Sequence, residues 1–206
     1  MNTNRAYYSS TIEDFLLAPC DAVLGEVTRS SGFAIELTQR DAWLKQIAVL
    51  REQLASLSGH LFFEFVVPRM GRRIDVLVII KHSVFVIEFK VGESKFNRSA
   101  LDQVWDYALD LKNFHEPSHT VTIAPILIAT EAHDVLCTVA ESHHNDGVLF
   151  PIKATPGSLR DCIKTVLSVG EGPTIDPMLW VSGRYKPTPT IVEAASALYD
   201  QHSVAN

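Results

Sequence analysis

Two acidic residues and a lysine lie beside apolar runs in residues 72–90, where buried strands would leave little room for charge. Asp75 follows the start of the first run, and the second run ends with Glu88-Phe89-Lys90. Charged side chains are rarely fully buried unless they are paired or bind an ion. Carboxylates bind hard cations such as Mg²⁺ or Mn²⁺, and a nearby lysine can offset charge on a reacting group. Metal-assisted chemistry is therefore the first hypothesis.

The expected pairing of the two runs brings these residues onto one sheet face. A two-residue hairpin loop at His82-Ser83 would place Asp75 opposite Lys90, with Glu88 as a diagonal neighbour. Opposed residues in antiparallel strands share a face, with Cβ atoms about 5 Å apart. A slip of one residue would move every side chain to the other face.

A third acid joins this group through the preceding strand. If Val67 lies opposite Arg72 across the turn at 68–71, then Glu64 lies opposite Asp75. Three carboxylates so close cannot all remain ionised without compensation, and a divalent cation would supply it. The alternative is an inert network of acids and lysine, solvated at a sheet edge.

Periodicity in the rest of the chain predicts the elements that hold this group. Apolar residues at helical spacing indicate helices, and continuous apolar runs bounded by turn residues indicate strands. Helices are expected at 39–57, 99–114 and 158–169, and strands at 61–67, on both sides of 81–83, at 122–130 and at 148–154. A strand, a helix and a further strand imply a parallel crossover, whereas short turns imply an antiparallel meander. We expect an α/β fold with a mixed sheet of about five strands between helical layers.

Two polar residues on the helix at 99–114 could reach the charged group. Gln103 and Tyr107 lie four residues apart, on a face offset from the apolar stripe formed by Leu101, Val104, Trp105, Ala108 and Leu111. Side chains at this spacing are neighbours on a helix surface. Ordinary packing of the helix surface is the alternative reading of this pair.

Composition narrows the class of protein. The chain has 206 residues, of which 47% are hydrophobic, so one domain with a sizeable core is expected. Its apolar runs are too short to span a membrane, and residues 1–20 do not resemble a signal peptide. The three widely spaced cysteines suggest reduced thiols and a cytoplasmic protein.

The charge is unevenly distributed. The formal net charge is −6, yet residues 69–98 hold seven basic side chains and three acidic ones. Such a local excess can bind an anion, although a solvated charged rim would look the same. The candidate phosphate contacts are Arg69, Arg72, Arg73, Lys95 and Arg98.

The spacing of the charged residues resembles a known nuclease superfamily. Asp75, followed thirteen residues later by Glu88-Phe89-Lys90, is similar to the PD-(D/E)xK motif, although Pro68 precedes Asp75 by seven residues. The pair Gln103 and Tyr107 resembles the Gln-x3-Tyr motif of RecB-like nucleases. The resemblance covers about residues 39–155 and implies a restriction-endonuclease-like, three-layer fold.

The resemblance also implies roles for individual residues. Catalytic residues would be Asp75, Glu88, Lys90, Gln103 and Tyr107. Metal ligands would be Asp75 and Glu88, with the Phe89 carbonyl and Glu64 as further ligands of Mg²⁺ or Mn²⁺. Some relatives hold an iron–sulfur cluster with four cysteines, which this chain lacks. The implied function is metal-dependent hydrolysis of nucleic acid, with DNA favoured over RNA.

Several segments also look like the N-terminal region of bacterial Schlafen-related helicase/ATPase proteins. That likeness implies a nuclease domain at 1–169, with an N-terminal helical part at 1–57 and a core at 58–169. Residues 170–206 would form a linker and the start of a helicase/ATPase domain in cis, or else a small docked helix. No phosphate-loop motif for ATP occurs in these residues.

Other functions also remain compatible with the sequence. The domain could bind nucleic acid without cutting it, or it could serve as a protein-interaction or homo-oligomerisation module.

Overall fold

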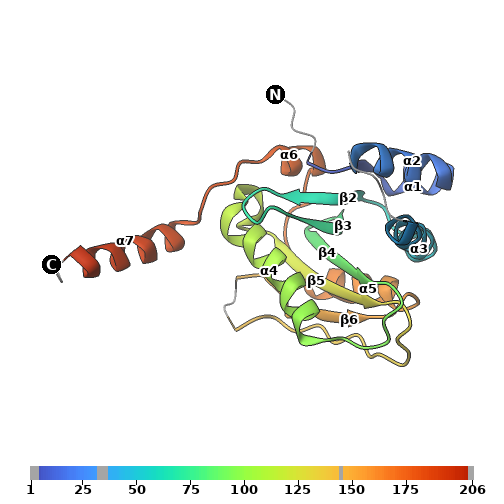
Figure 1. The fold of residues 1–206 in the computed structure, drawn as a ribbon. Coiled ribbons are helices and arrows are strands. Elements are labelled where there is room, and N and C mark those ends of the chain that lie inside the picture. Colours follow the sequence, from blue (N-terminus) through green and yellow to red (C-terminus); the bar gives the residue numbers. More distant parts are fainter. Residues whose placement is uncertain (1–4, 32–36, 144–145, 204–206) are drawn as a thin grey trace.

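A six-stranded sheet forms the centre of the computed structural model, which describes residues 5–31, 37–143 and 146–203 (Figure 1). The sheet order follows the chain: β1 (Tyr8–Thr11), β2 (His60–Val67), β3 (Arg72–Ile80), β4 (Ser83–Lys90), β5 (Thr122–Ala129) and β6 (Ile152–Ala154). Strands β1 to β4 pair antiparallel, whereas β4, β5 and β6 pair parallel. The expected mixed sheet, with a meander followed by a parallel crossover, is confirmed.

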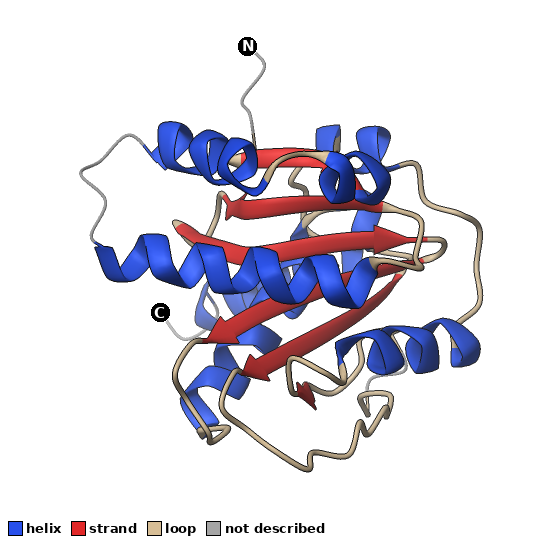
Figure 2. Cartoon of the chain, turned by 90° about the vertical axis from the view of Figure 1, so that its right-hand side faces the viewer, coloured by secondary structure: helices blue, strands red, loops and turns tan. Residues whose placement is uncertain are grey.

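Helices cover both faces of this sheet. They are α1 (Ile12–Leu17), α2 (Cys20–Ser31), α3 (Leu37–Leu54), α4 (Arg98–Phe114), α5 (Leu159–Val169), α6 (Pro177–Ser182) and α7 (Pro189–Ser203), with a 3₁₀ turn at Glu116–Ser118. One hydrophobic core joins the sheet to α1, α2, α3 and α5, and a second joins its other face to α4 and α6. Figure 2 shows helices in front of and behind the strands. None of the helices in the described ranges is long and apolar enough to cross a membrane.

Two strands differ from the expectation. Strand β1 lies within residues 1–57, which were expected to be helical, and it adds a sixth strand beside β2. Only Ile152–Ala154 of the strand expected at 148–154 forms β6, while Val148 makes a single bridge to Ile123. The sequence YSST of β1 has no apolar alternation, so its pairing is set by β2 rather than by its own pattern.

The β3–β4 hairpin has a register different from the expected one. Ile80 pairs with Ser83, so the loop is Lys81-His82 and not His82-Ser83. Lys81 has a φ of 53°, the left-handed conformation that suits a tight hairpin loop. Ser83 is fully buried as the first residue of β4. The shift of two residues keeps the paired residues of β3 and β4 on their expected faces, because the side-chain period of a strand is two.

The β2–β3 register agrees with the expectation, but it contains an irregularity at the two acids. Val67 pairs with Arg72 and Phe63 pairs with Val76. Phe63 belongs to the core under α3, yet Phe65 belongs to the core under α4, although residues two apart normally share a face. Strand β3 switches faces in the same way between Val76 and Ile74. Glu64, with a φ of 51°, and Asp75 therefore occupy the two switch points.

The segment after α5 was expected to be a linker, but much of it packs on the domain. Trp180 of α6 is 1% exposed and lies against Phe65 of β2. Main-chain hydrogen bonds join Ile175 to Lys81, and Lys186 to Phe114. This docking corrects the linker prediction up to about residue 188. Figure 1 shows α7 extending away from the body of the domain.

Candidate functional site

Asp75 and Glu88 meet where the β3–β4 ladder ends. The last paired residues are Val76 and Ile87, so the next positions along the two strands are the two acids. The Asp75 N–H donates to Glu88 Oε1 at 3.1 Å, and the Phe89 N–H donates to Asp75 Oδ2 at 2.9 Å. Each carboxylate therefore binds the main chain of the opposite strand, in place of a regular ladder hydrogen bond. Asp75 thus lies opposite Glu88, and not opposite Lys90 as expected.

Helix α4 brings Gln103 between the acid and the lysine. Gln103 Nε2 donates to Glu88 Oε2 at 3.1 Å, while Lys90 Nζ donates to Gln103 Oε1 at 3.3 Å. The same Nε2 lies 3.3 Å from the Tyr107 hydroxyl oxygen, and Tyr107 is buried at 2% exposure. The Gln103 amide therefore contacts three of the other four residues that the sequence predicted as catalytic, and the fourth, Asp75, is bonded to Glu88.

Local structure after β4 fixes the start of α4. The Asn97 side chain accepts from the Ala100 N–H at 2.9 Å, which is a typical N-terminal helix cap. Before it, Gly92 adopts a φ of 79° and its N–H donates to Thr130 Oγ1 at 2.9 Å. The Thr130 N–H in turn donates to the Lys90 carbonyl at 3.2 Å. These bonds tie the turn after Lys90 to the end of β5.

Burial dominates the electrostatics of the two acids. Glu88 is 2% exposed, and this burial raises its pKa well above the ordinary value, with further upward pressure from Asp75. Burial also raises the pKa of Asp75, and the nearby Glu64 charge adds to this rise. The pKa of Tyr107 is raised as well, chiefly by burial. A cation between the acids would relieve this cost, because opposite charge favours the ionised form.

The donors present are suited to a hard divalent cation. Asp75 and Glu88 supply carboxylate oxygens, and the Phe89 main chain lies within the same group. Within residues 5–31, 37–143 and 146–203, however, no group of three or more His, Cys, Asp or Glu side chains could hold a metal ion. Two acids with solvent or substrate oxygens fit Mg²⁺ chemistry, since Mg²⁺ usually keeps several waters.

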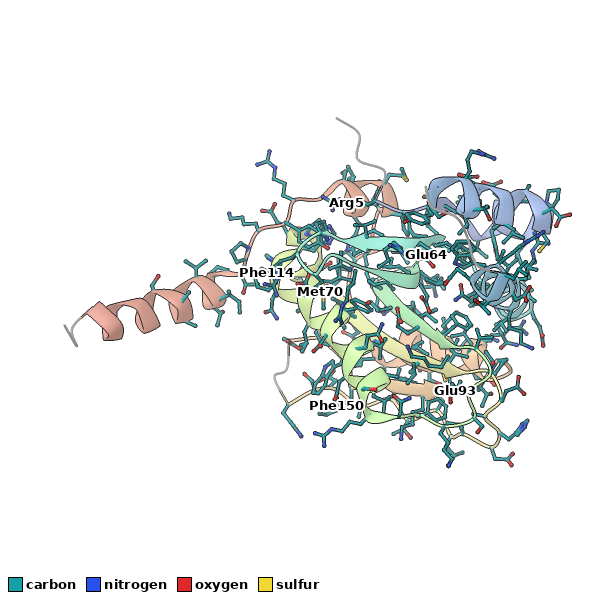
Figure 3. The ribbon with its side chains drawn as sticks, in the orientation of Figure 1. Arg5, Glu64, Met70, Glu93, Phe114 and Phe150 are labelled. Carbon is teal, nitrogen blue, oxygen red and sulfur yellow. The ribbon has the colours of Figure 1, made fainter. Side chains whose placement is uncertain are left out.

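Glu64 does not join the other two acids. Its Oε1 accepts from the Trp43 indole N–H at 2.8 Å and its Oε2 from Arg73 Nε at 2.7 Å. Trp43 belongs to α3, so Glu64, which is labelled on β2 in Figure 3, is bonded to the helix layer opposite α4. The expected register is present, but both carboxylate oxygens of Glu64 bind Trp43 and Arg73 instead of joining the group around Gln103.

The predicted basic contacts lie in different environments. Arg73 pairs with Glu64, and Arg69 pairs with Asp110 at 2.7 Å while its guanidinium lies over the Phe114 ring. Arg98 approaches Asp102 of its own helix at 3.8 Å. Arg72 and Lys95 are exposed. Of these five residues, Arg73 is the nearest in sequence to Asp75, and its side chain is held by the ion pair with Glu64.

Two aromatic residues of this region had no functional signal in the sequence. Trp43 fits the apolar stripe of its helix, and only the fold reveals that its indole N–H binds Glu64. Tyr7 precedes β1, and its ring lies 5.1 Å from the Arg73 guanidinium carbon. Contacts across so many residues of sequence leave no local pattern.

Comparison with known proteins adds no family to these observations. No protein-family model matches the chain, and no curated protein matches its sequence.

Proposed function

We propose that this chain is a metal-dependent nuclease domain that hydrolyses phosphodiester bonds, with DNA favoured over RNA. The observation that supports this most strongly is the bridge from Gln103 to Glu88 and Lys90, beside Asp75. The same residues carry the sequence resemblance to the PD-(D/E)xK and Gln-x3-Tyr motifs. Packing alone gives no reason to place two acids and a bridged lysine together, with Glu88 almost fully buried.

In this proposal Asp75, Glu88 and the Phe89 carbonyl hold Mg²⁺ or Mn²⁺. The bound ion would lower the pKa of a coordinated water and stabilise charge on the scissile phosphate. Lys90 orients that water and offsets developing negative charge through its ammonium group. Gln103 fixes Lys90 relative to Glu88, and Tyr107 supports Gln103 from the core side.

A restriction-endonuclease-like fold is part of the same proposal. Its support is the antiparallel meander that ends at the two acids, followed by a parallel crossover through α4. The basic residues Arg69, Arg72, Arg73, Lys95 and Arg98 are proposed contacts for phosphates outside the reacting group.

A cleavage assay tests the function directly. The purified chain is incubated with linear duplex, circular duplex, single-stranded DNA and RNA, each with Mg²⁺ and with EDTA. The proposal expects Mg²⁺-dependent shortening or nicking of at least one DNA substrate. Absence of cleavage on all four substrates, with either Mg²⁺ or Mn²⁺, would contradict it.

A second candidate is a module that binds nucleic acid without cutting. It is favoured by the contacts of Glu64, because this carboxylate binds Trp43 and Arg73 and leaves Asp75 and Glu88 as the acids bonded within the group around Gln103. Salt-dependent DNA binding without any cleavage would support this candidate. Absence of both binding and cleavage would instead favour a protein-interaction module.

A further inference from the structure

Glu64 is bonded as a positioning group rather than as a metal ligand. The side chain is 5% exposed, and each of its two oxygens accepts a hydrogen bond, one from Trp43 and one from Arg73. A cation at this carboxylate would lie beside a guanidinium, whose nitrogen is only 2.7 Å from Oε2. Like charges at such a distance oppose each other, so the arginine already fills the role of counter-ion.

Arg73 is held in one orientation by contacts on two sides. Its Nε donates to Glu64, and its guanidinium carbon lies 5.1 Å from the centre of the Tyr7 ring. Among the described residues, none accepts a hydrogen bond from its terminal nitrogens, and 47% of the side chain is exposed. A guanidinium fixed through Nε presents its other edge as a fork, which matches two oxygens of a phosphate.

This fork lies close to the acids but on the other side of the sheet from Lys90. Arg73 precedes Asp75 by two residues on β3, about 7 Å along the strand. Tyr7 and Trp43 pack with the core under α3, whereas Gln103 belongs to α4. A nucleic-acid strand bound across Asp75 and Glu88 would contact Lys90 on one side and Arg73 on the other.

We propose that Trp43 and Glu64 position Arg73 to bind a backbone phosphate next to the scissile bond. This inference rests on the proposed nuclease function and assigns Glu64 to the substrate-binding arm instead of the metal site. Arg73 would contact the substrate, and Glu64 and Trp43 would act only through Arg73.

The first test replaces Arg73 while keeping its charge. Arg73→Lys retains one positive charge but cannot bind Glu64 and a phosphate with a rigid fork. We expect DNA cleavage, as kcat/KM, to fall about ten- to a hundred-fold, with Mg²⁺ affinity unchanged by isothermal titration calorimetry. Arg29→Lys on the exposed end of α2 is the matched control and should leave kcat/KM unchanged. Wild-type cleavage by Arg73→Lys would overturn the inference.

The second test separates positioning from metal binding. Glu64→Gln should keep wild-type Mg²⁺ affinity, while Asp75→Asn should lose it. In cleavage, Glu64→Gln should reduce kcat/KM, and this loss should vanish when Arg73→Gln is already present, because the two residues act as one unit. An additive loss, or a fall in Mg²⁺ affinity comparable to that of Asp75→Asn, would make Glu64 a metal ligand and overturn the inference.

Two controls keep the outcomes separate. If Glu64→Gln does not fold, Trp43→Phe removes the indole N–H alone from the same network and should give the same cleavage phenotype at normal Mg²⁺ affinity. A wild-type protein that binds neither Mg²⁺ nor DNA would remove the proposed function and this inference together. A wild type that binds and cuts, with Arg73→Lys unimpaired, would contradict this inference alone.

Discussion

At the scale of single residues, Gln103 has the most connections in the candidate site. Its amide contacts Glu88, Lys90 and Tyr107, so one side chain sets the position of the Glu88 carboxylate relative to the Lys90 ammonium group. An amide suits this position because it donates with its nitrogen and accepts with its oxygen. Neither a carboxylate nor an ammonium could serve both partners.

Gln103→Ala should therefore disturb the reaction more than the fold. Partners that orient ligands and reacting groups typically contribute about ten- to a hundred-fold in activity or metal affinity, and we expect a loss of Mg²⁺-dependent cleavage in that range. Single-turnover kinetics at saturating Mg²⁺ would measure it. Asp106→Ala, on the exposed side of the same helix, is the control. Equal rates for the two variants would show that the Gln103 bridge has no role in catalysis.

The sequence was a good guide to these residues because their chemistry is unusual in a strand. Asp75, Glu88 and Lys90 interrupt apolar runs, and Gln103 and Tyr107 share a helix face, so their types and spacing are visible locally. The partners of Glu64 were not predictable. Trp43 lies on a separate helix, and the face switch that turns Glu64 toward it leaves no trace in the apolar pattern.

At the scale of elements, strands β2 to β5 were predicted well, whereas β1, most of the strand expected at 148–154 and the hairpin loop were not. Polar Ser83 was assigned to the loop, but it is small enough to be buried as the first residue of β4. The observed loop, Lys81-His82, begins one residue before the expected one, and the partner of each β3 residue on β4 is therefore shifted by two residues. Because two is the period of a strand, the predicted sheet face survived the wrong register.

Gly59 is the residue that lets β2 begin beside the end of β3. A Cβ at this position would lie 2.3 Å from the Ile79 carbonyl oxygen, a contact with main chain that cannot rotate away. We expect Gly59→Ala to lower the free energy of unfolding by about 1–3 kcal/mol, the range typical of overpacking. Urea denaturation would measure this change. Gly157→Ala has nothing within 4 Å of its new methyl group and should shift the midpoint far less. Similar midpoints for both variants would contradict the close approach.

At the scale of the whole molecule, the start of the described chain and the segment after α6 meet at the C-terminal end of α4. Arg5 contacts the His115 ring at 3.2 Å and donates to the Gly183 carbonyl at 2.6 Å. Figure 3 labels Arg5 and, near it, Phe114, the last residue of α4. His115 is fully buried against the rings of Trp180 and Tyr185. The sequence predicted a linker here because Pro, Gly and Thr dominate 170–190, and composition does not reveal that one tryptophan anchors the segment.

This junction predicts a pH dependence of stability. Burial, with help from the Arg5 charge, lowers the pKa of His115 from 6.5 to about 3. Between these two values the unfolded chain binds a proton that the folded chain excludes, so this contribution to stability is lost as pH falls below 6.5.

The prediction is tested as a difference between two proteins, because carboxyl groups also titrate in this range. His115→Gln removes the imidazole, so its stability relative to the wild type should improve as pH falls from 7 to 4, by up to about 1.4 kcal/mol per pH unit. Urea unfolding at several pH values would give this difference. A difference that does not change with pH would contradict a neutral, buried His115.

The central claim is that Asp75, Glu88 and Lys90 form a metal-dependent hydrolytic site, and Lys90→Ala tests it most directly. The substitution removes a positive charge and leaves both acids, so Mg²⁺ should bind at least as tightly as in the wild type. Cleavage should fall by the two to three orders of magnitude that correspond to about 3–4 kcal/mol for a lost transition-state stabiliser. Both proteins are purified in parallel and compared on one DNA substrate at saturating Mg²⁺. A Lys90→Ala protein that cuts as fast as the wild type would contradict the claim, because the observed activity would then come from another site or a contaminant.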